Sequence, residues 1–189
     1  MPIAQKWRLL TSVAAGIVVT ATTFMLKVPG LYSGDTTGDG FASFYVAILS
    51  ALYIWLAWRT KAAGRKRIAM VTGASLACVV LLFFSYHSLL AKWTVTPSGV
   101  SRPLITGTIL TDAATKFAKA HAITLAPLSM DDASRLLENG CYESEMVWSA
   151  GLQTRWTVLL AHYVILISGV CWCIVGAVYL IPERPIAGG

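Results

Sequence analysis

Four long runs without a charged residue dominate the pattern of apolar and polar positions along this chain. They cover residues 9–26, 41–58, 68–91 and 156–182. A run of roughly 18 or more apolar residues is long enough to cross the hydrocarbon core of a bilayer as a helix. Membrane helices also tolerate the Gly and β-branched residues that these runs contain. The pattern therefore predicts an all-α membrane protein with four transmembrane helices.

The longest segment of mixed polarity lies between the third and fourth runs and predicts a small cap. Its strand-like composition, N-cap residues and Gly stop signal indicate short elements that together bury a thin core. Ser129 opens a variant of the capping box, with Asp132 where Glu or Gln is usual. The expected elements are a strand at 104–110, a helix from Thr111 to about His121, a strand at 122–126 and a helix from Ser129 to Asn139, stopped by Gly140.

The distribution of charge predicts the orientation. The net charge is +6, and the surplus lies in the amino-terminal end and in the loop between the second and third runs. Short loops rich in Lys and Arg stay on the cytoplasmic side. A surplus on one side indicates topology and contact with anionic headgroups rather than with nucleic acid. The basic residues of the loop are Arg59, Lys61, Arg65, Lys66 and Arg67.

We therefore expect a multi-pass protein of a bacterial inner membrane with both termini in the cytoplasm. The domain prediction places transmembrane helices 1–3 in residues 1–92 and an extracytoplasmic α/β or helical cap in residues 93–154. Helix 4 and a cytoplasmic tail occupy residues 155–189.

Small residues recur at four-residue spacing in two of the runs. Such stripes let membrane helices approach closely, because helices in lipid associate through van der Waals packing. The two stripes could pack on each other or join copies of the chain, and both alternatives stay open. The stripes are Ser12, Gly16 and Thr20 in the first run and Ala69, Gly73 and Ala77 in the third.

Two histidines lie inside predicted spans, where an ionisable side chain is a hypothesis of function by default. Antiparallel spans would place His87 and His162 at similar depth, so together they could ligate a b-type haem. The alternative is that each neutral imidazole forms a hydrogen bond to a neighbouring side chain. Because the small-residue stripes favour a bundle too tight for a porphyrin, we expect no cofactor and a colourless protein.

No catalytic constellation accompanies these features. The cap contains no Ser-His-Asp, His-Glu-x-x-His or phosphate-binding glycine pattern. Cys141 is the only cysteine of the cap, which excludes a disulfide within it and leaves a free thiol or a bond between two copies. We therefore expect a protein that is not an enzyme.

A pattern near the last run resembles a known group of proteins. It consists of Leu-Leu-Glu-Asn-Gly at 136–140, then Val147 and Trp148, then Arg155 at the start of the run. It is similar to that of small four-span bacterial inner-membrane proteins, some of which are encoded with soluble partners in phage-defence or stress-signalling operons. The resemblance implies a membrane sensor or effector subunit with a cytosolic partner.

The functional hypothesis is a non-enzymatic integral membrane subunit. It would assemble with itself or with partner membrane or cytosolic proteins, and sense or scaffold through its outer cap. The alternatives are a membrane-perturbing effector of a defence or stress system and a b-type haem electron-transfer subunit.

Overall fold

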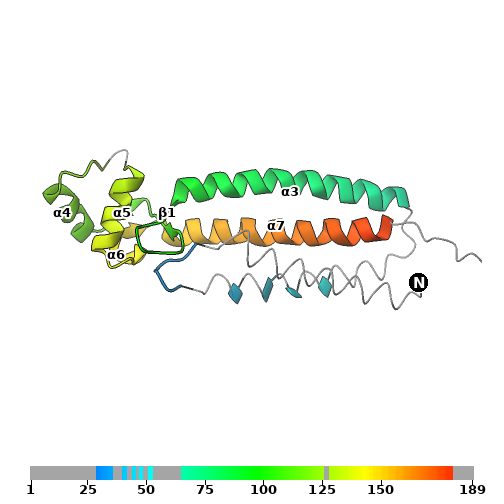
Figure 1. The fold of residues 1–189 in the computed structure, drawn as a ribbon, viewed down its shortest axis with the longest axis horizontal. Coiled ribbons are helices and arrows are strands. Elements are labelled where there is room, and N and C mark those ends of the chain that lie inside the picture. Colours follow the sequence, from blue (N-terminus) through cyan, green and yellow to red (C-terminus); the bar gives the residue numbers. More distant parts are fainter. Residues whose placement is uncertain are drawn as a thin grey trace, which may run out of the picture. The chain divides into compact units, whose positions relative to one another are not determined.

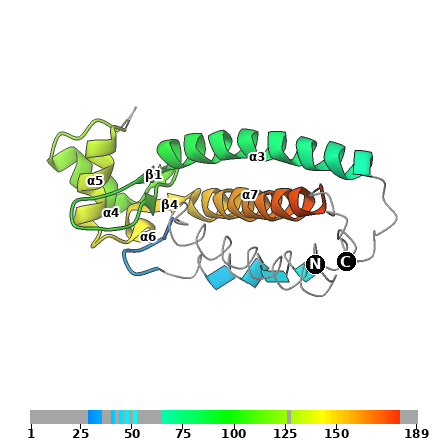
Figure 2. The same cartoon turned by 45° about the vertical axis from the view of Figure 1, so that its right-hand side comes forward.

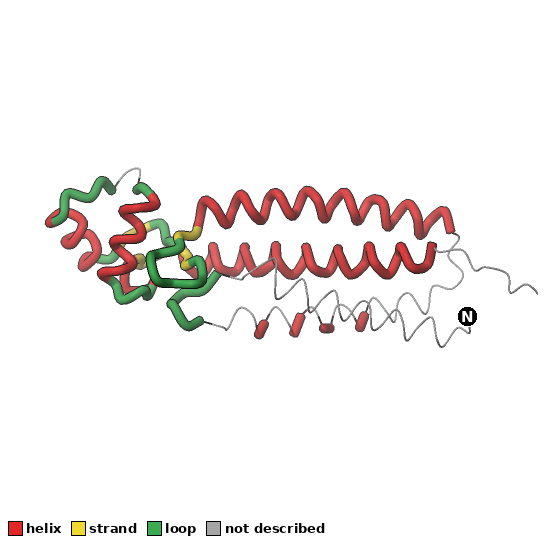
Figure 3. Tube along the Cα trace, viewed as in Figure 1, coloured by secondary structure: helices red, strands yellow, loops and turns green. Residues whose placement is uncertain are grey.

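The computed structural model describes residues 29–35, 40–41, 44–45, 47–48, 51–52, 65–125 and 128–180. Two long helices, three short helices and four very short strands lie in these ranges (Figures 1 and 3). In chain order they are α3 Arg65–Trp93, β1 Thr94–Val95, β2 Leu104–Ile105, β3 Ile109–Leu110, α4 Asp112–Ala120, α5 Met130–Asn139, α6 Ser144–Val147, β4 Trp148–Ala150 and α7 Leu152–Leu180.

The prediction of an all-α protein with four transmembrane helices is wrong. The described residues contain two helices that are long and apolar enough to cross a membrane, Lys66–Trp93 and Leu152–Ile174. They also contain two small antiparallel sheets. The run at 9–26 lies outside the described residues, and the run at 41–58 lies mostly outside them. An uncharged run of sufficient length permits a span but does not establish one.

The chain divides into two compact units. One, here called the helical unit, comprises Met1–Met25, Phe44–Phe83 and Val164–Gly189. The other, here called the cap unit, comprises Leu26–Ser43 and Phe84–Tyr163. The cap unit thus contains the carboxyl end of α3 and the amino end of α7 in addition to the short elements.

Within the helical unit, α3 and α7 lie side by side and run antiparallel (Figure 2). Gly176 lies against Thr72, and Gly169 lies against Val79. A Cβ on Gly169 would lie 2.6 Å from Val79 Cγ2, closer than real contacts allow. The partners on both helices are seven residues apart, which is the spacing of a left-handed, coiled-coil-like seam.

On α3 the same seven-residue step recurs within the cap unit. The rings of Tyr86 and Tyr163 lie 6.3 Å apart between centroids, and both side chains are buried. Seven residues further along α3, the guanidinium of Arg155 lies 5.6 Å from the centroid of the Trp93 ring. Each pair joins one residue of α3 to one of α7, so these two helices are also in contact within the cap unit.

The short strands of the cap unit form two separate sheets. β1 pairs with β2, with Thr94 opposite Ile105, and β3 pairs with β4 through an irregular register. Residues 29–35 attach to the first sheet, because Gly30 N donates to Pro103 O and Ile105 N donates to Gly30 O. Residues 29–35 are therefore part of the cap unit.

The two predicted cap helices are confirmed. The Thr111 hydroxyl accepts a hydrogen bond from Ala114 N at the start of α4, and the Ser129 hydroxyl accepts one from Asp132 N at the start of α5. Gly140 ends α5 as expected. These signals act within three or four residues, which is why the sequence alone reveals them.

The strand predictions were less accurate. The expected strand at 104–110 is broken into β2 and β3, because the backbone between them turns toward the end of α3. Residues 122–125 form no strand, and Ala122 has a φ of 54° directly after α4.

Candidate functional site

The end of α3 is joined to the start of α7 by a small polar cluster. Thr106 donates two hydrogen bonds to the carbonyl oxygen of Trp93, from its backbone N at 2.8 Å and from its hydroxyl at 3.0 Å. Arg155 Nη1 lies within hydrogen-bond distance of Thr106 O (2.7 Å), Thr106 Oγ1 (2.9 Å) and Gly107 O (2.9 Å). Arg155, in the first turn of α7, therefore holds the loop at Thr106 in place, and Thr106 in turn donates hydrogen bonds to the last carbonyl group of α3. We call Trp93, Thr106, Gly107 and Arg155 the junction cluster.

Two glycines allow the backbone to pass through this region. A Cβ on Gly107 would lie 2.5 Å from Ala150 O and would also collide with the Trp148 side chain. Gly151 has a φ of +86°, a left-handed conformation that favours Gly, and joins β4 to α7. Since each position excludes a larger side chain, the tight turn at the junction cluster is encoded locally.

A cavity of about 200 Å³ lies beside the junction cluster. Its wall includes Trp148, the hydroxyl-bearing residues Thr94 and Thr106, and Ser129 at the start of α5. A single buried water needs only about 10–15 Å³ by the same kind of measure. The cavity therefore has room for a polar group of several atoms.

Two cations line this cavity, Lys92 from the last turn of α3 and Arg155 from the first turn of α7. None of the described lining residues is acidic. The hydroxyls of Thr94 and Thr106 already donate to Leu90 O and Trp93 O. Donors for a ligand would therefore come from Lys92, from Arg155 and from the first N–H groups of α5, which have no partner within their helix.

The two predicted haem ligands lie at the same level of the α3–α7 pair. His87 follows Tyr86, and His162 precedes Tyr163, in two helices that run in opposite directions. At 100° per residue, these steps turn the two imidazoles to opposite sides of the pair. His87 is exposed, and His162 Nδ1 lies 2.9 Å from the carbonyl oxygen of Val158 in its own helix. The arrangement does not bring the two rings together, and haem ligation stays an untested alternative.

The basic loop and the small-residue stripes are described only in part. Lys66 and Arg67 lie in the first turn of α3, which begins at Arg65, whereas Arg59 and Lys61 lie outside the described residues. Ala69, Gly73 and Ala77 are exposed on α3, and a Cβ on Gly73 would meet nothing within 4 Å. The other stripe, Ser12, Gly16 and Thr20, lies outside the described residues. The packing role of both stripes stays a prediction.

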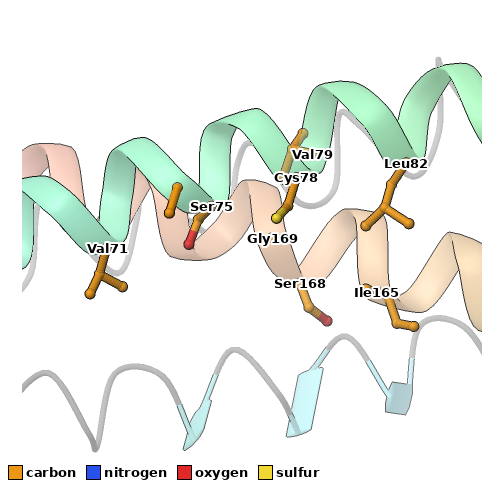
Figure 4. Close-up of a pocket in the computed structure, with 9 residues that line it drawn as sticks. Val71, Ser75, Cys78, Val79, Leu82, Ile165, Ser168 and Gly169 are labelled. Atoms are coloured by element: carbon orange, nitrogen blue, oxygen red, sulfur yellow. The ribbon is translucent and has the colours of Figure 1, made fainter.

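Gly169 and Gly176, the two glycines of α7 in close contact with α3, were not among the residues predicted for helix packing. Their seven-residue spacing was the signal that could have identified them. Beside this seam lies an apolar groove of about 460 Å³ in the helical unit. Val71, Ser75 and Leu82 of α3 and Ile165 and Ser168 of α7 point toward the same side of the pair there (Figure 4).

The four cysteines are not paired with one another. Cys141 is exposed in the cap unit, Cys78 is exposed on α3, and Cys171 and Cys173 lie in α7. Within the described ranges no three His, Cys, Asp or Glu side chains are close enough to hold a metal ion.

No protein-family model matches this chain, and no curated protein and no solved structure matches it either. The functional interpretation consequently depends on the geometry of the junction cluster, the adjoining cavity and the two long helices.

Proposed function

We propose that the protein is a non-enzymatic integral membrane subunit that assembles with itself or with partner proteins and senses or scaffolds through its cap. In this proposal α3 and α7 cross the bilayer. The basic residues at the start of α3 lie in the cytoplasm, and the cap lies on the opposite face. The carboxyl terminus is then cytoplasmic, and we propose the same side for the amino terminus.

Exposed apolar side chains on α3 support a bilayer as its surroundings. Met70, Leu81 and Phe84 are 71%, 70% and 68% exposed. Water-soluble proteins rarely leave such a continuous apolar surface uncovered, whereas the hydrocarbon core of a membrane solvates it.

The direct connection between the cap and both long helices carries the proposal of sensing. β1 begins at Thr94, immediately after Trp93, and one residue, Gly151, separates β4 from α7. With no flexible linker at either connection, and with Arg155 fixing the loop at Thr106, a displacement of the cap moves the ends of both helices. A cap that binds a partner can therefore bias the packing of the spans.

Assembly is tested with two differently tagged copies of the full chain, extracted together in native nanodiscs. We expect one tag to recover the other, and Gly73→Leu to weaken that recovery, since the exposed stripe of α3 is the surface available for another helix. A matched control is Val80→Leu, which enlarges an exposed residue of α3 outside the stripe. Particles that contain a single copy and no further protein would refute the proposal.

A further inference from the structure

The cavity beside the junction cluster has the composition of an anion site. Its charged lining residues among those described are both cations, Lys92 and Arg155. Within the described ranges, Arg155 donates to protein acceptors only through Nη1, so Nε and Nη2 can donate to a ligand. The guanidinium is held in place by three oxygens and by the Trp93 ring. Its orientation is consequently set before any ligand arrives, which lowers the entropic cost of binding.

If the two candidate spans cross the bilayer, as proposed above, the cavity lies at the level where a membrane presents phosphate groups. Lys92 is the penultimate residue of the candidate span Lys66–Trp93, and Arg155 lies in the first turn of the candidate span Leu152–Ile174. Trp93 and Trp156 occupy the same two helix ends, and Trp is enriched at membrane interfaces. Lipid headgroups at this depth carry a phosphate diester with two unesterified oxygens, which matches the forked donors of an arginine.

We propose that this cavity binds the phosphate of an anionic phospholipid headgroup, with Arg155 as a bidentate donor and Lys92 as the second cation. The first N–H groups of α5, at Met130 and Asp131, supply further donors at the cavity wall near Ser129. Binding would hold the cap against the bilayer at the point where it joins both helices.

The acidic residues of α5 limit the affinity of the cavity for an anion. Asp131 and Asp132 lie in the first turn, and Asp132 Oδ2 accepts a hydrogen bond from the Ser129 hydroxyl at 2.7 Å. Their charge opposes an anion, so affinity depends on both cations. Asp131 is exposed and makes no side-chain hydrogen bond to the rest of the described chain. Asp131→Asn should therefore tighten binding, while the Ser129 cap stays intact.

The test measures binding of dihexanoyl phosphatidylglycerol to the full chain in a neutral maltoside detergent by isothermal titration calorimetry. Lys92→Gln removes one cation without altering the junction cluster. Lys116→Gln is the matched control, because Lys116 is exposed on α4 and does not line the cavity. We expect Lys92→Gln to weaken binding about ten-fold, which is the loss of one charge-assisted contact. Lys116→Gln should leave the dissociation constant within about two-fold.

Inorganic phosphate is the second probe. If inorganic phosphate binds more weakly than the lipid, the headgroup is the source of the phosphate. If it binds at least as tightly as the lipid, and Lys92→Gln weakens both, free phosphate is the ligand and the lipid assignment is wrong. Equal affinities of Lys92→Gln and Lys116→Gln, or no heat with either probe, overturn the anion site itself.

The proposed lipid site rests on the proposed function in one respect: α3 and α7 must cross the bilayer for the cavity to lie at the headgroups. Binding is measured in detergent on the isolated chain, whereas assembly is measured by recovery of a second tag. The two can therefore fail separately.

Discussion

Replacing Arg155 by Met is the perturbation that most sharply tests the junction cluster. The substitution keeps a long side chain but removes the donors to Thr106 O, Thr106 Oγ1 and Gly107 O. A hydrogen bond to a charged group contributes about 1.5–3 kcal/mol. The three acceptors share Nη1, which has two N–H groups, and Arg155 is partly exposed, so we take a total of about 2 kcal/mol for them. Loss of the contact with Trp93 adds roughly 0.5–1 kcal/mol.

The expected destabilisation of about 2–3 kcal/mol corresponds to a fall in melting temperature of roughly 5–10 °C for a chain of this size. The local effect is measured by hydrogen exchange, because the Thr106 amide donates to Trp93 O and should lose protection in the variant. Arg155→Lys keeps the charge but lacks the planar guanidinium. Its melting temperature should lie between those of the wild-type protein and Arg155→Met.

Arg135→Met is the matched control. Arg135 is exposed on α5 and makes no hydrogen bond within the described part of the chain. Its replacement should change the free energy of unfolding by less than about 0.5 kcal/mol. If Arg155→Met has the same melting temperature as Arg135→Met, and the exchange rate of the Thr106 amide is unchanged, the junction cluster does not couple the cap to the helices.

Three further outcomes are expected. Gly176→Leu should lower the melting temperature of the chain in detergent, because its side chain would collide with Thr72. Gly73→Leu should leave the α3–α7 seam intact. Equal falls in melting temperature for the two variants would contradict the seam. Gly107→Ala should expose the cap to limited proteolysis at low protease concentration, since no Cβ fits beside Trp148, and an unchanged digestion pattern would show that the loop can move aside. An absorption spectrum of the purified protein should contain no Soret band, and a haem spectrum would restore the electron-transfer alternative.

Local signals predicted the cap helices well. Thr111 and Ser129 cap α4 and α5 through bonds to residues only three positions away. On α5, Ala133, Leu136 and Leu137 are buried on one face at helical spacing, whereas Met130 is exposed. Such features depend on one helical turn and need no knowledge of the remaining chain.

The junction cluster could not be predicted, because its contacts join residues far apart in the sequence. Arg155 bonds to Thr106 across 49 positions, and Tyr86 faces Tyr163 across a still longer separation. From the sequence, Arg155 is predicted only to start a span, and residues 104–110 are predicted to form one strand. The turn toward Trp93 that interrupts this strand is favoured by contacts that form only in the folded cap.

The packing of the long helices could not be predicted from the sequence for a different reason. A search for small residues at four-residue spacing selected Gly73, whereas the described contacts of α7 follow a seven-residue step through Gly169 and Gly176. Both spacings let helices approach closely, and composition alone does not choose between them. Hydropathy likewise identified candidate spans by length, but length does not establish how many of them cross a bilayer.

The most direct test of the central claim, a membrane subunit with an outward cap, uses the exposed thiol of Cys141. Intact cells or spheroplasts expressing the full chain are treated with a membrane-impermeant maleimide, and Cys141→Ser provides the control for labelling at the other cysteines. We expect Cys141 to be labelled from outside without lysis, and the thiol of a Lys66→Cys variant to be labelled only after the membrane is opened. Labelling of Cys141 only after lysis, or of both positions from outside, would contradict it.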